Sequence, residues 1–265
     1  MRRQGRRVGA ALYASVVFAW LCLGGPPPAG QLTIEVISPQ VHAQPAIVQT
    51  AAPTVLIYHT HTWEAYEMTK DTQYTPTETW RTKDERYNMV RIGQALAEEL
   101  TALGFRVTHD TTAFEPPNLS SAYVRSLDML ETRLKAGEAY DYILDIHRDA
   151  YSGLWNGANC AVKDGEQLAY VMLLVGKGTG ETGSGFDERP DWPSNLALAQ
   201  EITGAMNTQV PGVARDVKIK SGRFNQHVSP NALLIEVGNN RNTIEEALAV
   251  CPVIAKAIDE VHAQR

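Results

Sequence analysis

Residues 55–66, VLIYHTHTWEAY, join an apolar run to a cluster of groups that can bind a metal ion. The first four residues have the composition of a short buried strand. His59 and His61 follow at once, and Glu64 comes three residues after His61. Two imidazoles and a carboxylate at the mouth of a strand predict a functional site at this point of the fold.

Strand-like and helix-like runs alternate from Thr54 to the end of the chain. Further strands are expected at 105–110, 142–146, 170–176 and 232–238. Apolar residues at helical spacing predict helices at 89–103, 123–134 and 195–207. A last helix is expected after a Thr243–Glu246 capping box, with a kink at Pro252. This alternation predicts a single α/β domain with a mainly parallel central sheet flanked by helices.

Three of the predicted strands lead into residues suited to metal chemistry. Besides residues 59–64, His147, Arg148 and Asp149 follow the strand at 142–146, and Glu236 follows residues 232–235. Ligands of an open parallel sheet bind beyond the carboxyl ends of its strands, so we expect these groups to converge at one edge. Two imidazoles and one carboxylate form a known catalytic zinc set that leaves a position for water. Zinc activates that water, and a further carboxylate can act as general base.

Each of these residues also has a structural interpretation. A histidine at a strand end is often a hydrogen-bonded structural residue, and His109 is interpreted in that way. Glu236 is the strongest single signal, because a carboxylate inside an apolar strand is costly to bury without a partner. A salt bridge from Glu236 to Arg148 or Arg223 is the structural alternative.

The N-terminal region has a different composition. Four arginines within residues 2–7 precede a nearly uncharged apolar run at 8–25, the pattern of a signal peptide or membrane anchor at 1–25. Residues 26–53 are interpreted as a linker and 54–265 as the folded domain. Basic residues before the apolar run place the domain outside the membrane. The protein is expected to be membrane-anchored, or secreted if the segment is cleaved.

Charge and cysteine content argue against a nucleic-acid-binding protein and against a disulfide-rich protein. The 265 residues carry a formal net charge of -6 and show no basic stripe, so nucleic-acid binding is not expected. Outside the apolar run, Cys160 and Cys251 are too few for a disulfide framework, and whether they pair is left open.

Four motifs together resemble the stage II sporulation protein P family: VLIYHTHTWEAY, NMVRIG, DIHRDA and RFNQHVSPNALLIEVGNNRNTIEEA. The resemblance runs from about Thr54 to the C-terminus. That family is similar in turn to the zinc-dependent N-acetylmuramoyl-L-alanine amidases. The resemblance implies a membrane-anchored cell-wall hydrolase of spore-forming bacteria. It would cut the amide between N-acetylmuramic acid and the stem peptide, with a lytic transglycosylase, stage II sporulation protein D, as partner during engulfment.

Carried over residue by residue, the resemblance assigns roles at the predicted edge. His61 and His147 become zinc ligands, and Glu236 becomes the catalytic carboxylate. Glu64 is preferred as the carboxylate ligand, and Glu85 is the alternative. The remaining assignments give His59 and Asp149 supporting or alternative ligand roles, Arg148 a catalytic role at the oxyanion, and Arg223, Asn225 and Gln226 contacts with substrate.

Two other functions stay open at this stage. A metal-dependent peptidoglycan endopeptidase would use the same activated water, and the family is also credited with that activity. A non-catalytic wall-binding scaffold is the third interpretation, and the presence of all the candidate groups argues against it.

Overall fold

The structure is a computed structural model that describes residues 51–150, 159–178 and 191–265. These residues belong to one compact unit that spans Gln49–Arg265. The expected anchor at 1–25 and nearly all of the expected linker lie outside the described residues. Within the described part, no helix has the length and apolar character needed to cross a bilayer.

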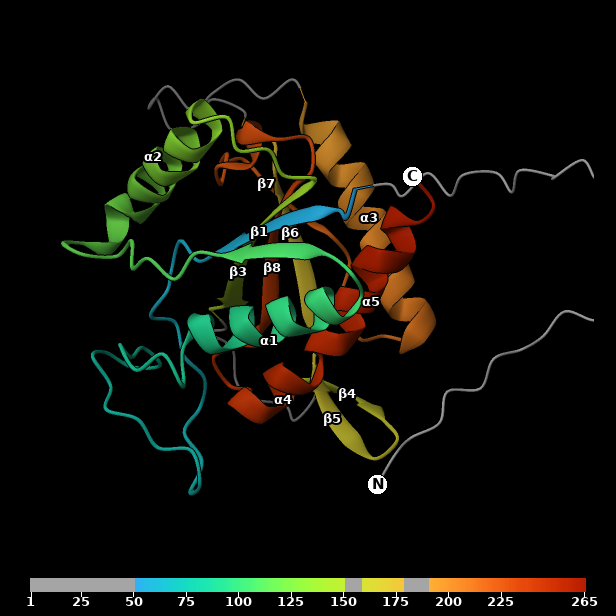
Figure 1. The fold of residues 1–265 in the computed structure, drawn as a ribbon. Helices are drawn as coiled ribbons and strands as arrows, with labels where there is room; N and C mark the ends of the chain where they lie inside the picture. The colour runs from blue at the N-terminus through green and yellow to red at the C-terminus, as the bar shows by residue number, and fades with distance from the viewer. Residues whose placement is uncertain (1–50, 151–158, 179–190) are drawn as a thin grey trace, which may run out of the picture. The chain divides into compact units, whose positions relative to one another are not determined.

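The sequence prediction of a mainly parallel central sheet is confirmed. Six strands lie in the order β2-β1-β3-β8-β6-β7 (Figure 1). Every neighbouring pair is parallel except β6 and β8, which are antiparallel. The strands are β1 (Thr54–Tyr58), β2 (Arg106–His109), β3 (Tyr142–Asp149), β6 (Val171–Gly176), β7 (Lys218–Lys220) and β8 (Ala232–Asn239).

Alternation along β1 divides the core between the two faces of the sheet. Val55 and Ile57 join the large core cluster, together with residues of α1 (Met89–Ala102), α3 (Trp192–Gln209) and α5 (Cys251–His262). Leu56 and Tyr58 belong to a smaller cluster on the opposite face, under α2 (Ala122–Lys135). Helices therefore flank both faces, as the continuous apolar strands predict.

Two local features depart from the sequence prediction. The capping box at Thr243 is present, but the chain forms two helices, α4 (Ile244–Ala249) and α5, where one kinked helix was expected. Pro252 stands in the first turn of α5, where its missing N–H costs nothing. An unpredicted hairpin joins β4 (Cys160–Lys163) to β5 (Glu166–Ala169). Its Asp-Gly turn has positive φ at both residues, a known hairpin signal.

The two strands that carry the candidate site are longer than the sequence suggested. His147 lies inside β3 and not beyond its end, whereas Glu236 lies inside β8 as predicted, and the two are direct partners in the parallel register. The register of the two strands shifts just after His147, between His147 and Asp149. Paired residues of neighbouring strands point to the same face of a sheet, so these two side chains are lateral neighbours.

Candidate active site

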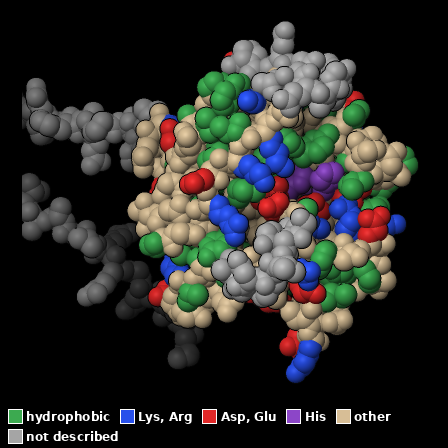
Figure 2. Space-filling view, turned by 180° about the vertical axis from the view of Figure 1, so that it is seen from behind, with side chains coloured by type: hydrophobic (Ala, Val, Ile, Leu, Met, Phe, Trp, Pro, Cys, Tyr) green, Lys and Arg blue, Asp and Glu red, His purple; other side chains and the backbone are tan. Residues whose placement is uncertain are grey.

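Two imidazoles meet where β1 and β3 lie side by side. The ring centroids of His61 and His147 are 5.3 Å apart, with the planes at 85°. Tyr123 of α2 stacks on His147 with an interplanar angle of 10° and meets His61 edge-on. Histidine side chains gather on one face of the molecule, among acidic and basic groups (Figure 2). The fold therefore brings together two histidines that are 86 positions apart.

Glu64 lies beside this pair as a buried anion. Its Oε2 is 3.6 Å from Nδ1 of His147 and accepts a hydrogen bond from the backbone N–H of Arg148 at 3.2 Å. Burial alone would raise the pKa of Glu64. Hydrogen bonding from His147 and the charge of Arg148 outweigh burial and lower that pKa to about 2. Glu64 can thus offer a carboxylate to a cation at neutral pH.

Asp145 contacts the other side of the His147 ring. Its Oδ1 is 2.8 Å from Nε2 of His147, although the direction of this contact is not that of a hydrogen bond. The carboxylate accepts bonds from the backbone N–H and the hydroxyl of Thr60 at 2.8 and 2.7 Å. Burial opposes charge on both partners, but the ion pair raises the pKa of His147 and, with the Thr60 bonds, lowers that of Asp145.

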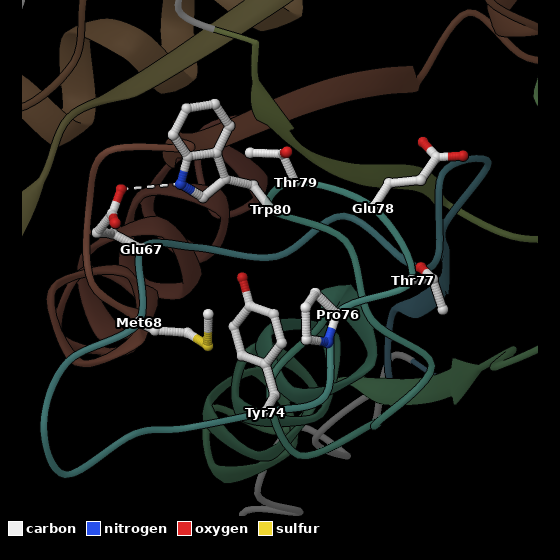
Figure 3. Close-up of a pocket in the computed structure, with 8 residues that line it drawn as sticks. All are labelled: Glu67, Met68, Tyr74, Pro76, Thr77, Glu78, Thr79 and Trp80. Atoms are coloured by element: carbon white, nitrogen blue, oxygen red, sulfur yellow. Dashed lines mark hydrogen bonds between the residues drawn. The ribbon is translucent and has the colours of Figure 1, made fainter.

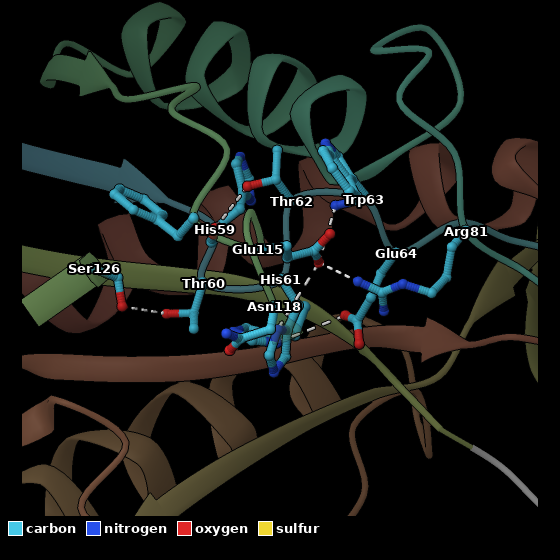
Figure 4. Close-up of polar contacts among 12 residues, drawn as sticks. His59, Thr60, His61, Thr62, Trp63, Glu64, Arg81, Glu115, Asn118 and Ser126 are labelled. Carbon is cyan, nitrogen blue, oxygen red and sulfur yellow. Dashed lines mark hydrogen bonds and ion pairs between the residues drawn. The ribbon is translucent and has the colours of Figure 1, made fainter. Parts of the chain in front are cut away.

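Glu115 occupies the corresponding position behind His61. It forms an ion pair with Arg81, accepts the backbone N–H of Trp63 at 3.3 Å, and lies 3.9 Å from Nδ1 of His61 (Figure 4). Burial raises the pKa of Glu115 even though Arg81 opposes this. Burial, followed by the charge of His147, lowers the pKa of His61 to about 4. His61 is therefore a neutral imidazole.

Glu236 completes the group from β8. It is 9% exposed and lies directly across from His147 in the sheet register. Burial is the main cause that raises the pKa of Glu236 to about 8, and the carboxylates of Glu64 and Asp149 add to it. A carboxyl group with such a raised proton affinity is suited to proton transfer.

Four polar atoms of this group have no hydrogen-bond partner among the described residues. They are Nδ1 of His61, Nε2 of His147, Oε2 of Glu115 and Oε2 of Glu236, and all four are buried. Buried polar atoms normally have partners, so these atoms mark a place prepared for a ligand. Two imidazoles and a carboxylate match the donor set of catalytic zinc. No cluster of three or more His, Cys, Asp or Glu in the described ranges is arranged as a metal site.

The alternative ligands lie elsewhere. Glu85 is exposed on the loop before α1. His59 is fully buried, with Nδ1 3.0 Å from the carbonyl of Ile146 and Nε2 2.9 Å from Nε2 of His109. Both ring nitrogens of His59 are thus already hydrogen-bonded. His109 is its partner, in line with the structural interpretation of that residue.

Arg148 has a different position from the one expected. Its Nε and Nη2 donate to the carbonyls of Ala65 and Trp80 at 3.0 and 3.1 Å. The sequence predicts an oxyanion donor, but these bonds commit the guanidinium to the loop that carries Glu64. Asp149 lies at the end of β3, half-buried, and its register partner in β8 is Asn239.

The three residues expected to contact substrate lie in and around the segment between β7 and β8. Asn225 and Gln226 are each 1% exposed. Asn225 donates to the carbonyl of Tyr123 and to Ser126, and Gln226 bonds to the backbone of β6. Both side-chain amides are hydrogen-bonded inside the protein, and contact with substrate stays a prediction for these residues. Arg223 is half-buried just before them.

Sequence reasoning missed two carboxylates of the site. Asp145 carried a readable signal, because it is an acidic residue in an apolar strand, two positions before His147 and on the same face. Glu115 had no such signal in the sequence, because it approaches His61 from a loop with no periodic pattern. Tyr123 was interpreted only as part of a helix face.

Comparison with known proteins gives one family and several weak structural likenesses. The family model for stage II sporulation protein P matches residues 33–259, a longer stretch than the motifs suggested. Stage II sporulation protein P of Bacillus subtilis (strain 168) is 26% identical over 219 residues, which cover 78% of this chain and 51% of the relative. The chain thus spans about half the length of the curated relative it matches.

Two solved structures show the extent of the structural likeness. N-acetylmuramoyl-L-alanine amidase AmiC2 of Nostoc punctiforme is 14% identical, with a TM-score of 0.46 over 80% of this chain and 98% of that one. An N-acetylmuramoyl-L-alanine amidase from Clostridium difficile 630 is 17% identical, with a TM-score of 0.44 over 81% and 97%. A likeness at this level assigns no function to the chain.

Proposed function

Because this chain belongs to the stage II sporulation protein P family, we propose that it is a peptidoglycan hydrolase that acts in sporulation. The reaction we propose is hydrolysis of the amide between N-acetylmuramic acid and the first residue of the stem peptide. The observation that carries the proposal is the placement of Glu236 directly beside His147, in a group that also contains His61 and Glu64.

His61, Glu64 and His147 are the residues that would hold zinc. Their donor types fit the metal, Glu64 is an anion, and one ring nitrogen of each histidine has no partner among the described residues. When bound, zinc polarises a carbonyl group and supplies hydroxide near neutral pH.

Glu236 takes the proton of the attacking water and returns it to the leaving amine. A group that must accept a proton and then release it works best when its pKa lies near the working pH. Burial of Glu236 between β3 and β6 provides that condition, since it raises the pKa to about 8. Met172 is its register partner on the β6 side.

Asp145 and Glu115 orient the two imidazoles from behind. Asp145 is fixed by Thr60, and Thr60 is fixed in turn by the hydroxyl of Ser126 at 2.9 Å. A carboxylate behind a metal-bound imidazole sets the tautomer and the direction of the ring. Asp145 lies beside Nε2 of His147 and Glu64 lies beside Nδ1, so the two carboxylates together fix the direction of the ring.

The test is digestion of purified peptidoglycan by the purified protein, with and without a chelator. We expect hydrolysis that the chelator abolishes and zinc restores. Glu236→Gln should keep stoichiometric zinc and lose about 10²–10⁴-fold in rate, the usual contribution of general acid–base catalysis. Full activity in Glu236→Gln would show that the proton-transfer role is wrong.

Mass spectrometry of the released fragments decides which bond is cut. Intact stem peptides would support the amidase reaction, and cut cross-links would support the endopeptidase alternative. A protein that binds wall material without stoichiometric zinc and without cleavage would be a scaffold. We further propose that the site works outside the membrane and together with a lytic transglycosylase, which would remove the naked glycan.

A further inference from the structure

A cleft of about 440 Å³ opens in the loop between β1 and α1 (Figure 3). Its walls are Met68, Tyr74, Pro76 and Trp80, and its rim carries hydroxyl and carboxylate groups. Met68 is 38% exposed, which is high for a large apolar side chain. The volume falls in the range of about 300–1,000 Å³ that small-molecule sites occupy.

Trp80 is held rigidly on one side of this cleft. Its indole N–H donates to Glu67 at 2.8 Å, and the guanidinium of Arg241 lies 4.6 Å from the ring centroid. The backbone of Trp80 has a φ of 55°, which a bulky residue adopts only when its surroundings require it. A fixed aromatic plane can stack on a ring of a ligand at little cost in side-chain entropy.

The same residue joins the cleft to the catalytic group. The carbonyl of Trp80 accepts the backbone N–H of Ala65 at 2.8 Å and Nη2 of Arg148 at 3.1 Å. Arg148 in turn donates its backbone N–H to Glu64. The cleft is therefore tied by hydrogen bonds to the loop that carries Glu64.

The charges of the cleft select between the two parts of a peptidoglycan substrate. Glu67 and Glu78 are the charged residues among the described ones that line it, and each is paired with an arginine, Arg241 at 3.5 Å and Arg81 at 3.9 Å. The stem peptide of peptidoglycan carries several carboxylates, and none of the described lining residues is a cation that would pair with them. The glycan strand is neutral along its N-acetylglucosamine units and offers hydroxyl and amide N–H donors, which carboxylates and threonine hydroxyls accept.

We propose that this cleft binds an N-acetylated sugar ring of the glycan strand whose amide is cut at the catalytic group. The apolar face of the sugar would stack against Trp80 and Met68, while its polar edge would face the rim of the cleft. The inference rests on the proposed function for the identity of the substrate, and it concerns binding that needs no cleavage.

The experiment titrates a chitin trisaccharide into the full chain carrying Glu236→Gln, by calorimetry. We expect saturable binding that a free L-Ala-D-Glu-diaminopimelate tripeptide does not displace. Trp80→Leu should weaken trisaccharide binding by about tenfold or more, as loss of a central aromatic contact usually does. Because Trp80 also supports its loop, Met68→Gln serves as a second variant, and it should weaken binding without lowering the melting temperature.

Val162→Gln is the matched control, since Val162 is an exposed apolar residue on β4, 67% exposed, outside the cleft. It should bind the trisaccharide like the parent. Absence of trisaccharide binding, or displacement by the tripeptide, would overturn the proposal. Binding of the trisaccharide by a parent protein that never digests peptidoglycan would instead retain the cleft assignment and reject the proposed hydrolysis.

Discussion

Two histidine pairs in this protein have nearly the same ring geometry but differ in the hydrogen bonds that their ring nitrogens form. The rings of His59 and His109 lie 5.1 Å apart at 83°, and those of His61 and His147 lie 5.3 Å apart at 85°. In the first pair, Nε2 bonds to Nε2 at 2.9 Å, and the other nitrogen of His59 bonds to a backbone carbonyl. In the second pair, Nδ1 of His61 and Nε2 of His147 are buried and form no hydrogen bond with the described residues, and each faces a carboxylate, at 3.9 and 2.8 Å.

The surroundings of the two pairs explain the difference. Burial, followed by the charge of His109, lowers the pKa of His59 to about 3, so that ring is neutral and satisfied. His61 and His147 are surrounded by three carboxylates, Glu64, Asp145 and Glu115. Hydrogen-bond satisfaction, and not ring contact, thus distinguishes a structural histidine pair from a pair prepared for a ligand.

Removal of a ligand from the second pair should have the largest effect. His61→Ala or His147→Ala should lower zinc affinity by well over about 100-fold, because loss of an outer partner alone costs about 10–100-fold. Hydrolysis should disappear with the metal. Zinc content after dialysis and competition with a chromogenic chelator measure both variants.

The matched control for this test is His109→Ala in the first pair. It should keep one zinc per folded molecule. Equal loss of zinc in His109→Ala and His61→Ala would end the distinction between the two pairs.

The next effect concerns the carboxylate behind His147. Asp145→Asn keeps the size of the side chain but removes the charge that fixes the ring. We expect zinc affinity to fall by about 10–100-fold. Zinc content after dialysis, measured beside the melting temperature, separates this loss of affinity from a loss of stability. Unchanged zinc affinity in folded Asp145→Asn would assign Asp145 a purely structural role.

A smaller effect, on the free energy of unfolding, is expected from a substitution in helix α1 where it packs on His59 and His109. A Cβ on Gly93 would lie 2.5 Å from Nε2 of both His59 and His109. Gly93→Ala gains up to about 1 kcal/mol in helix propensity. Overpacking costs about 1–3 kcal/mol and should outweigh that gain, so the free energy of unfolding should fall while zinc affinity stays constant.

Gly204 of α3 provides a matched control for Gly93, since nothing lies within 4 Å of a Cβ built there. Gly204→Ala should stabilise the protein in the same urea titration. Stabilisation by both substitutions would show that the helix does not press on the histidine pair.

The sequence predicts the strands and helices that carry the two histidine pairs better than it predicts the hydrogen bonds of those histidines. Apolar runs and helical periodicity place β1, β3, β8 and the helices, because burial imposes these patterns on the chain. The convergence of His61, Glu64, His147 and Glu236 follows from strands that end at one edge. The sequence does not show that His59 bonds to His109, since that contact depends on how β1 and β2 pack beneath α1.

The smallest expected effect is a pH dependence of the first pair. Burial lowers the pKa of His109, and Asp110 only partly offsets this. The unfolded chain binds a proton at His109 near pH 6.5, whereas the folded protein does not, so stability falls as the pH drops below about 6.5. The loss is at most about 1.4 kcal/mol per pH unit. His109→Gln keeps a donor for His59 and removes this titration. Urea unfolding at pH 7 and pH 5.5 should therefore show a smaller drop for His109→Gln than for the parent, and equal drops would mean that His109 is protonated in the folded protein.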